Sequence, residues 1–487
     1  MDVPGTTIDH VALLPAYVAA ATALLVFLAD LVLGGRRTPV LVLGILGSAG
    51  TLVAAWYAHH DGARSAFCTP CSYVWDDTAA LVGMLFAGAT LVVFGFSVAT
   101  LRTVPAGEYG FLLACSLTGG VVLGAARDLI TLIIALETLT LPLYVLVGLR
   151  RRSRASAEAA VTFFVVSVVS TAVTLLGAAL LYAATGWIHL DRLAEALTDR
   201  SALLSQPLVG VAVVLVLAGL AFKVAAVPFH AWAPSTYDGA PLPVAAYLST
   251  ASKLGGVIAI LLVAVRGLEP WLDVVGPAIA VLAVLTMTVG NLAALRQRRM
   301  VRLLAWSSVA QAGYILAPLG ALALASGRSP EVVPVLVTAT LAYTAFYLVL
   351  ELTAFGSVIA LRGSLDGGTF SDYQGAASRR PWVVGAFVVA LTGLAGLPPG
   401  LAGLFAKVTI VRALLDGGAG WLAVVVAINA VIGLAYYIRA SVALFGPPSA
   451  TAWPRLPVLA GGVLLLVTLI SVAVGFAPQF VLDAISP

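Results

Sequence analysis

The chain has 487 residues, of which 61% are hydrophobic and 10% are charged, and its mean hydropathy is +1.06. This composition excludes a soluble globular protein and indicates a polytopic membrane protein, so we assign the net charge of +4 to membrane orientation rather than to nucleic-acid binding. The apolar runs are about 20 residues long and do not alternate with polar residues, which predicts an all-α fold of spanning helices.

Hydropathy along the chain predicts about fourteen spans, and no linker is long enough to separate soluble domains. The expected limits are 11–33, 40–58, 78–100, 109–126, 128–149, 159–184, 207–232, 241–265, 272–294, 301–323, 332–361, 382–414, 421–443 and 456–478. The polar residues 185–206 predict a short surface helix. We expect the seventh and twelfth spans to be discontinuous, because prolines interrupt them near Pro228 and at Pro398 and Pro399.

Arginine predicts how the chain is oriented in the membrane. The loops after odd-numbered spans hold 15 arginines and the loops after even-numbered spans hold 7. By the positive-inside rule the odd loops are cytoplasmic, and an even number of spans then leaves both termini on the outer face.

The loop after the second span contains Cys68 and Cys71 in a CxxC pattern, with His59 and His60 upstream. Two cysteines and two histidines could hold zinc, but this spacing fits no standard finger. A loop disulfide or two free thiols is favoured, and the expected outer location permits a disulfide.

Only three of the 26 basic residues are lysines, and all three, Lys223, Lys253 and Lys407, fall inside apolar runs. A lysine at the bilayer centre costs roughly 2.5–3.5 kcal/mol. Lys223 and Lys253 lie too deep in their runs to extend to the interface. A desolvated lysine can lose its proton near neutrality, whereas arginine stays charged, so the lysines predict ion handling. A codon bias toward arginine would explain the loops but not the buried lysines.

Glu137 is a fourth candidate charge in the membrane, with no other charge within eight residues on either side. A lone carboxylate there either protonates or finds a cation, and Lys223 is the natural candidate. Two interpretations stay open, which are a structural ion pair and a proton-loading site whose affinity depends on whether the pair is closed.

Lys253 has no acidic neighbour in its own helix, which suits a proton carrier. His230, near the Pro228 break, could pass protons between Lys223 and Lys253 or could only satisfy freed backbone groups. Several other polar residues could support a water wire or simply join helices by hydrogen bonds. They are Ser307, Ser308, Tyr314, Tyr343, Asn429 and Tyr436. Glu351 is a further mid-span carboxylate to which the sequence assigns no role.

Two eight-residue segments, 217–224 and 401–408, are identical at six positions and each contains a lysine beside a proline break. The expected topology runs them in opposite directions across the membrane. Inverted-repeat transporters show this pattern, with ion sites at discontinuous helices.

Five stretches together match one protein family. They are LETLTLPLYVL around Glu137, the stretch from Phe222 to Lys253 with its YDGAP segment, RLLAWSSVAQAGYIL from Arg302, GLPPGLAGLFAK ending at Lys407, and YYIR ending at Arg439. The chain resembles, over residues 80–445, the subunit N family of the proton-pumping NADH–quinone oxidoreductase, respiratory complex I. A lysine in the eighth span and the YDGAP segment favour subunit N over its sister subunits L and M.

The resemblance implies fourteen helices with two inverted five-helix repeats. The expected parts are residues 1–105 with the first three helices, 106–265 and 266–443 as the repeats, and 444–487 with the last helix. It also implies that Glu137 and Lys223 form a modulating pair, that Lys253 is the central relay, and that Lys407 faces the outlet or the next subunit.

The implied partners are adjacent antiporter-like subunits, small membrane subunits and a hydrophilic arm. The sequence contains no nucleotide loop, Fe–S cysteine set or haem site, so we expect no cofactor in this chain and assign quinone, FMN and Fe–S clusters to partner subunits.

The chain departs from the family at Thr162, where a lysine usually follows four residues after the glutamate that is here Glu158. Two other functions remain as alternatives, an Mrp-type cation/proton antiporter subunit and a free-standing solute transporter. The YDGAP and YYIR segments favour a subunit of a redox-driven proton pump over both of these alternatives.

Overall fold

The computed structural model describes residues 8–60, 62–68, 70–150, 153–199, 206–447 and 453–485. The α-helices are α1 (Leu14–Leu33), α2 (Arg37–His60), α3 (Asp77–Phe96), α4 (Ala106–Ala125), α5 (Leu129–Val147), α6 (Arg154–Thr185), α7 (Leu190–Thr198), α8 (Gln206–Lys223), α9 (Trp232–Gly239), α10 (Leu242–Tyr247), α11 (Lys253–Leu261), α12 (Leu272–Ala294), α13 (Met300–Gly320), α14 (Val332–Arg362), α15 (Ala376–Arg379), α16 (Pro381–Ala395), α17 (Leu401–Asp416), α18 (Gly420–Ala443), α19 (Val458–Phe476) and α20 (Gln479–Ile485). Short 3-10 or π-helical segments are η1 (Thr100–Arg102), η2 (Leu248–Ser252), η3 (Leu262–Gly267), η4 (Glu269–Trp271), η5 (Ala321–Ala323), η6 (Ser326–Arg328) and η7 (Phe370–Tyr373). The strands are β1 (Arg64–Ala66) and β2 (Tyr73–Trp75), which pair antiparallel.

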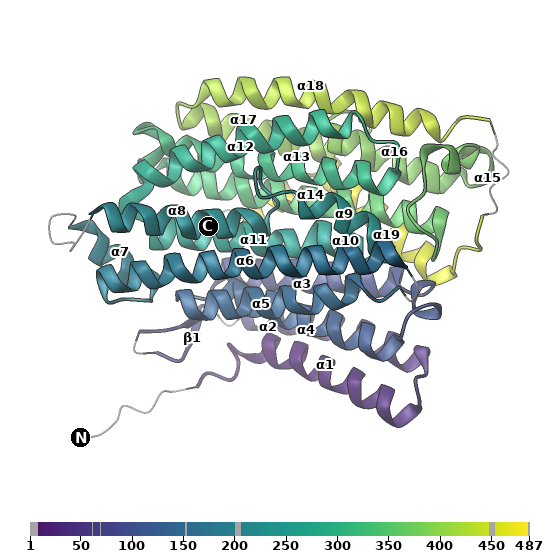
Figure 1. Ribbon diagram of the computed structural model, residues 1–487, viewed down its shortest axis with the longest axis horizontal. Coiled ribbons are helices and arrows are strands. Elements are labelled where there is room, and N and C mark those ends of the chain that lie inside the picture. The colour runs from purple at the N-terminus through teal and green to yellow at the C-terminus, as the bar shows by residue number, and fades with distance from the viewer. Residues whose placement is uncertain are drawn as a thin grey trace.

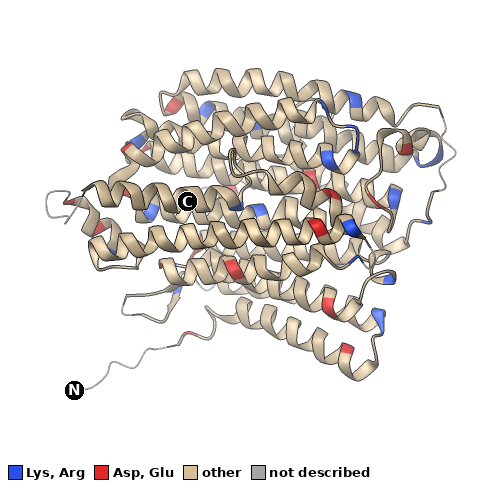
Figure 2. Cartoon of the chain, in the orientation of Figure 1, with Lys and Arg blue, Asp and Glu red and all other residues tan. Residues whose placement is uncertain are grey.

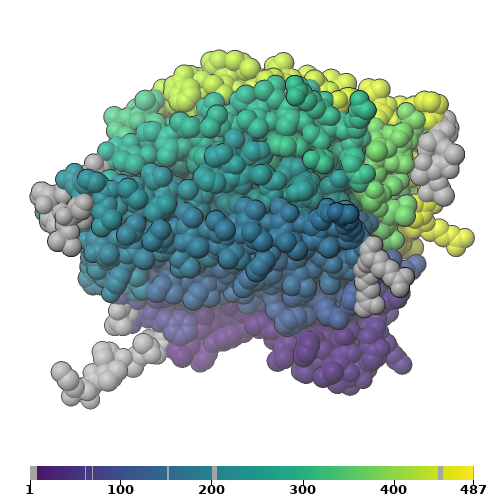
Figure 3. All heavy atoms as spheres, viewed as in Figure 1, coloured from purple at the N-terminus to yellow at the C-terminus, as the bar shows by residue number. Residues whose placement is uncertain are grey.

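The long helices lie side by side, with α1 at one edge of the bundle and α18 at the opposite edge (Figure 1). Side chains fill the spaces between the helices on the face turned to the viewer. Across this face the chain runs from its N-terminal part (purple) at one edge to its C-terminal part (yellow) at the other (Figure 3). Within the described residues, 12 helices are long and apolar enough to cross a membrane. The chain is therefore an all-α multi-pass membrane protein, as its hydropathy predicts.

Every range expected to span the membrane is occupied by a helix. The ranges of α13 and of the α16–α17 pair fall outside the 12 candidate spans, because α13 is less apolar and α16 and α17 are each short. The expected surface helix is present as α7, while residues 200–205 of that stretch lie outside the described residues.

Local capping explains where several helices begin and end. The side chains of Asp76, Asp128 and Ser153 accept hydrogen bonds from the free backbone N–H groups at the starts of α3, α5 and α6. Gly34 and Gly186 end α1 and α6 in the left-handed conformation, with φ of 63° and 75°, which glycine adopts without steric cost.

Both expected helix breaks are present. The first separates α8, which ends at Lys223, from α9, and the second separates α16 from α17. Lys223 lies before its break whereas Lys407 lies after the other one, so the eight-residue sequence match does not mark equivalent positions.

Hydrogen bonds compensate the backbone groups that the first break frees. Val227 N donates to Thr286 Oγ1 at 2.9 Å, and the Phe222 carbonyl accepts from Trp232 Nε1 at 3.2 Å. Non-helical backbone within a membrane is tolerated only where neighbouring groups satisfy it in this way.

The segments α10, η2, α11 and η3 form one rod, Leu242–Gly267, at the centre of the bundle. Within its most apolar window 94% of the residues are buried, against 22% for α1 and 28% for α6. Lys253 follows directly after the π-helical segment η2 of this rod. π-helical segments are rare and frequently occur at functional sites.

Charged residues gather toward the two ends of the bundle, and the middle of most helices is free of them (Figure 2). At one end Arg299 donates to Asp238 and to Asp366, and Arg362 also donates to Asp366. The other end contains the Arg127–Asp76 and Arg266–Asp191 pairs.

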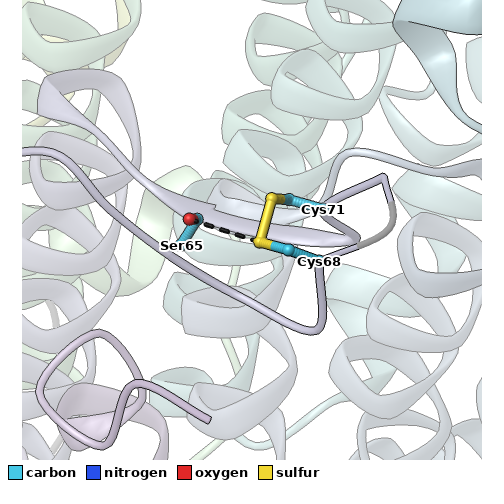
Figure 4. The surroundings of a disulfide bond; sticks show 3 residues. All are labelled: Ser65, Cys68 and Cys71. Atoms are coloured by element: carbon cyan, nitrogen blue, oxygen red, sulfur yellow. Dashed lines mark hydrogen bonds between the residues drawn. A yellow bond between two sulfur atoms is a disulfide. The ribbon is translucent and has the colours of Figure 1, made fainter. Parts of the chain in front are cut away.

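Cys68 and Cys71 form a disulfide in the connection between β1 and β2, where Cys68 Sγ lies 3.3 Å from Ser65 Oγ (Figure 4). Of the alternatives that the CxxC pattern leaves open, the structure has the loop disulfide. No cluster of His, Cys, Asp and Glu that could hold a metal is found in the part of the chain that the structure describes.

Candidate functional site

The first buried ionic site joins α5 and α8. Lys223 Nζ lies 2.8 Å from Glu137 Oε1, and the two side chains are 5% and 20% exposed. The structure therefore brings these two residues together, as expected for Glu137 and its candidate partner. Because α8 ends at Lys223, the ammonium group lies beside the break in that helix.

Hydroxyl groups surround this pair. Thr171 Oγ1 donates to Glu137 Oε1 at 2.6 Å, and Lys223 Nζ also contacts Thr140 Oγ1 at 3.3 Å and Ser167 Oγ at 3.2 Å. Tyr144 OH donates to Ser167 Oγ at 2.5 Å. These groups satisfy the remaining hydrogen-bonding capacity of a buried ion pair, without which the pair would be strongly destabilising.

Sequence reasoning missed these four hydroxyl residues. A signal for two of them was present in α6, where small polar residues recur at helical spacing, at Ser167, Ser170, Thr171 and Thr174. That spacing puts polar side chains on one side of an otherwise apolar helix.

The second site is centred on Lys253. Its Nζ donates to the Ser308 carbonyl and, at 2.6 Å, to Ser308 Oγ. Ser308 Oγ is 2.7 Å from Tyr347 OH, which donates to the Ser249 carbonyl at 2.7 Å. The lysine is 2% exposed, so these contacts replace water around it.

Lys407 forms the third site at the other broken helix. Its Nζ donates to the Leu394 carbonyl at 3.2 Å and to the Ala395 carbonyl at 2.5 Å, and lies 5.2 Å from the centre of the Tyr314 ring. Leu394 and Ala395 are the last residues of α16. The free carbonyl groups at a helix C-terminus carry partial negative charge and therefore stabilise a cation.

Polar groups extend between the second and third sites, with Ser308 and Ser307 joined only as neighbours along the backbone. Ser307, next to Ser308, lies 2.5 Å from Tyr437 OH, which accepts from Gln311 Nε2 at 3.1 Å. Gln311 Nε2 also donates to the Leu394 carbonyl at 3.1 Å, the same oxygen that Lys407 contacts. Tyr343 OH donates to Gln311 Oε1 at 2.7 Å.

The six polar residues that the sequence offered as support for a water wire therefore fall into two groups. Ser307, Ser308 and Tyr343 belong to the connection between Lys253 and Lys407. The other three, Tyr314, Asn429 and Tyr436, gather around Asn291, a residue that sequence reasoning missed together with Gln311 and Tyr437.

His230 lies in the first break and is half-buried, with its ring centre 5.2 Å from that of Trp306. Among the described residues its side chain forms no hydrogen bond with Lys223 or Lys253, and no direct hydrogen bond joins the two lysines. A proton that moved between them would need an intermediate carrier.

Thr162 lines a cavity of about 650 Å³ at the end of the bundle that holds Arg299 and Asp366. Glu158 and Asp238 also line this cavity. It lies on the side of the odd-numbered loops, and Thr162 is five residues before Ser167 on α6. The position of the missing lysine is thus between this cavity and the Glu137–Lys223 pair.

Comparison with known proteins decides the family. The family described as "NADH:quinone oxidoreductase/Mrp antiporter, TM" matches residues 126–433. The chain is 59% identical to "NADH-quinone oxidoreductase subunit N" of Salinispora tropica, and the match covers 98% of each chain. The chain belongs to the subunit N family of NADH-quinone oxidoreductase. It is an antiporter-like membrane subunit.

Solved structures agree with this membership. A chain of respiratory complex I from Thermus thermophilus is 28% identical, with a TM-score of 0.81 and coverage of 97% of this chain and 99% of that one. A chain of the Mrp complex from Dietzia sp. is 22% identical, with a TM-score of 0.84 and coverage of 98% and 97%. The Mrp likeness shows a shared fold.

Proposed function

We propose that the chain carries protons along a buried axis from Glu137 and Lys223 through Lys253 to Lys407, driven by quinone reduction elsewhere in an NADH-quinone oxidoreductase. The observation that carries the proposal is that every lysine of this membrane chain lies in a polar site, with Lys223 and Lys253 buried and Lys407 half-buried. The Glu137–Lys223 pair lies at one broken helix and Lys407 at the other.

The Glu137–Lys223 contact supports a role as the modulating pair. A closed pair favours the charged forms of both groups, because each stabilises the other in a low-dielectric interior. Opening it removes that stabilisation and allows the lysine to give up its proton. The break after Lys223 lets the end of α8 move without bending a continuous helix.

Lys253 is the proposed central relay. Polar groups lie between it and the third site, because Ser307, Gln311 and Tyr437 extend from the neighbourhood of Ser308 toward Lys407. Side-chain hydroxyl groups both donate and accept, so they can pass a proton, although they cannot store one near neutral pH. His230 remains the candidate carrier between Lys223 and Lys253, because it lies in the break close to α13.

We propose fourteen membrane crossings, with α13 and the broken α16–α17 helix counted in addition to the 12 candidate spans. The two inverted five-helix repeats would be residues 106–265 and 266–443, with 1–105 and 444–487 outside them. One discontinuous helix in each half supports this division. The excess of arginine in the odd loops supports outward-facing termini in a bacterial cell membrane.

The proposed partners are other membrane subunits of the complex, especially adjacent antiporter-like and small membrane subunits. The likeness to a chain of Thermus thermophilus complex I supports this assembly. Quinone, FMN and Fe–S clusters would be held by those partners.

An Mrp-type antiporter subunit is the second candidate function, favoured only by the shared fold. It predicts Na⁺-dependent transport that needs no quinone.

The test is Lys253→Ala in the assembled complex, reconstituted in vesicles and supplied with NADH and quinone. We expect the complex to assemble, because the hydrogen bonds of Lys253 go to the uncharged Ser308, and a carboxylate left without its cation can take up a proton. Proton pumping per NADH oxidised should fall severalfold. Normal pumping by an assembled Lys253→Ala complex would overturn the relay.

A further inference from the structure

Glu351 is a carboxylate in the middle of α14 that the relay described above does not use. It is 0% exposed, and both its carboxylate oxygens are buried without a hydrogen-bond partner in the described part of the chain. An ionised carboxylate in this position is strongly unfavourable unless a cation compensates it. Such a group is kept neutral by a proton or is held near a positive charge.

The positive charge is supplied by Lys253 on α11. The two residues come from different helices and form no direct hydrogen bond or ion pair in the described part of the chain, and Lys253 is the cation whose charge acts on the Glu351 carboxylate. Tyr347 lies one helical turn before Glu351 on α14, and its hydroxyl group is 2.7 Å from Ser308 Oγ. Lys253 Nζ donates to that same serine oxygen at 2.6 Å and lies 5.9 Å from the centre of the Tyr347 ring.

We propose that Glu351 is a second proton-binding residue of the Lys253 site and accepts the proton that Lys253 releases. This inference rests on the proposed function, since it needs Lys253 to be a relay. It assigns a role to a carboxylate that the Glu137–Lys223–Lys253–Lys407 axis leaves out.

The transfer is balanced in atoms and charge. One N–H bond of the Lys253 ammonium group breaks and one O–H bond forms on Glu351, which leaves a neutral amine and a neutral carboxylic acid. No electron moves, and the net charge of the pair is zero before and after. In a buried site the desolvation cost of two charges opposes their attraction, and the transfer removes that cost because it neutralises both groups.

The surroundings of Glu351 contain no other strong base in the described residues. The titratable groups that interact with it are Lys253, Tyr347 on its own helix, Tyr237 on α9 and Tyr437 on α18. Tyrosine side chains titrate near pH 10 when unperturbed and therefore remain protonated over the working range. Lys253 is thus the group that exchanges protons with Glu351, and because the two side chains share no hydrogen bond, the proton needs a carrier between them.

The site differs from the Glu137–Lys223 pair in how the acid is held. Glu137 accepts hydrogen bonds from both Lys223 and Thr171, whereas Glu351 has no donor among the described residues. Hydrogen bonds therefore hold the first carboxylate in place, and none in the described part of the chain holds the second. Two acid–lysine sites in series would let the chain hold one proton at each while the next transfer occurs.

The test uses the complete complex in vesicles with Glu351→Gln, and Glu331→Gln as the matched control. Glu331 precedes α14 and is exposed, so the same chemical change is made at the end of the same helix. We expect Glu351→Gln to reduce protons pumped per NADH severalfold and Glu331→Gln to leave the ratio unchanged. Glu351→Asp keeps a carboxylate and should retain most of the pumping, but with a displaced pH profile.

The outcomes separate this inference from the proposed function. If Lys253→Ala abolishes pumping while Glu351→Gln pumps as the wild type does, the Glu351 role is wrong and the relay stands. If Lys253→Ala itself pumps normally, the proposed function fails. Should Glu351→Gln not assemble, Glu351→Asp decides, because a pumping pH profile identical to that of the wild type would overturn the inference.

Discussion

Lys223 Nζ and Glu137 Oε1 lie 2.8 Å apart although 86 residues separate them in the chain. The contact crosses from the end of α8 to the middle of α5, and Thr171 on α6 donates to the same carboxylate oxygen. Three helices are therefore joined at one partly buried carboxylate. Loss of that carboxylate affects both the proton axis and the packing of the three helices.

Glu137→Ala should reduce complex assembly more than Glu137→Gln. Alanine leaves a cavity and an unpaired Lys223, and breaking a buried ion pair by removing one partner costs roughly 3–5 kcal/mol. Glutamine keeps the volume and an acceptor oxygen. The measurement is the yield of intact complex from membranes, with Ile134→Ala as the control because Ile134, on the same helix, is 61% exposed. Equal yields for the two Glu137 variants would argue against a close pair.

Gln311→Leu should weaken proton movement between Lys253 and Lys407. The glutamine amide contacts Tyr343, Tyr437 and the Leu394 carbonyl, so leucine removes three hydrogen bonds at once. Leaving a buried donor or acceptor unsatisfied costs about 1–3 kcal/mol. We expect a lower ratio of protons pumped to NADH oxidised. Gln297→Leu, at the end of the bundle, should pump normally; a similar loss in both variants would contradict the route through Gln311.

Thr162→Lys should be tolerated and should move the acid limb of the pumping profile to lower pH. The new cation would lie by the cavity that Thr162 lines, which solvates it, and nearby positive charge favours the ionised form of a carboxylate. Thr162 is nine residues before Thr171, about 13 Å along α6, so the displacement should be modest. The pH dependence of pumping in the two complexes tests this. An unmoved acid limb would mean that Thr162 is too distant or that Glu137 is not the titrating group.

Arg299→Gln should destabilise the complex, and the effect should depend on pH. Burial raises the pKa of Asp366, but hydrogen bonds from Arg299 and Arg362 outweigh it and hold that pKa below its usual range. A depressed carboxylate pKa gives stability that is present above the ordinary Asp pKa of about 3.9 and is lost as pH falls through the folded value. Partly exposed pairs such as this contribute about 0–1 kcal/mol each.

Thermal unfolding of the solubilised complex measures this effect. The difference in melting temperature between wild type and Arg299→Gln should be largest near neutral pH and should shrink below about pH 4. Arg298→Gln removes an exposed neighbouring charge and is the matched control. A difference that stays constant down to acid pH would show that Arg299 acts through packing instead.

The sequence alone determined which parts of the chain form the long apolar helices and where two of those helices break. Hydropathy and proline act locally, over about one span, so they can be read without knowing the neighbours of a helix. The three lysines within apolar runs and the isolated Glu137 could be recognised from the sequence for the same reason. The free-energy cost of placing a charged side chain there comes from the apolar surroundings, whichever helix lies beside it. The disulfide was one of several outcomes that the CxxC pattern allowed.

Only the tertiary structure decided which groups face one another. Ser308 as the partner of Lys253, the carbonyl groups of Leu394 and Ala395 around Lys407, and the position of Glu351 all depend on how each helix is rotated and which helix lies beside it. Because most of these helices are apolar on nearly every side, hydropathy carries almost no information about how each helix is rotated about its own axis. Close packing and the need to satisfy each buried polar group select one arrangement, and these act between residues that are far apart in the chain.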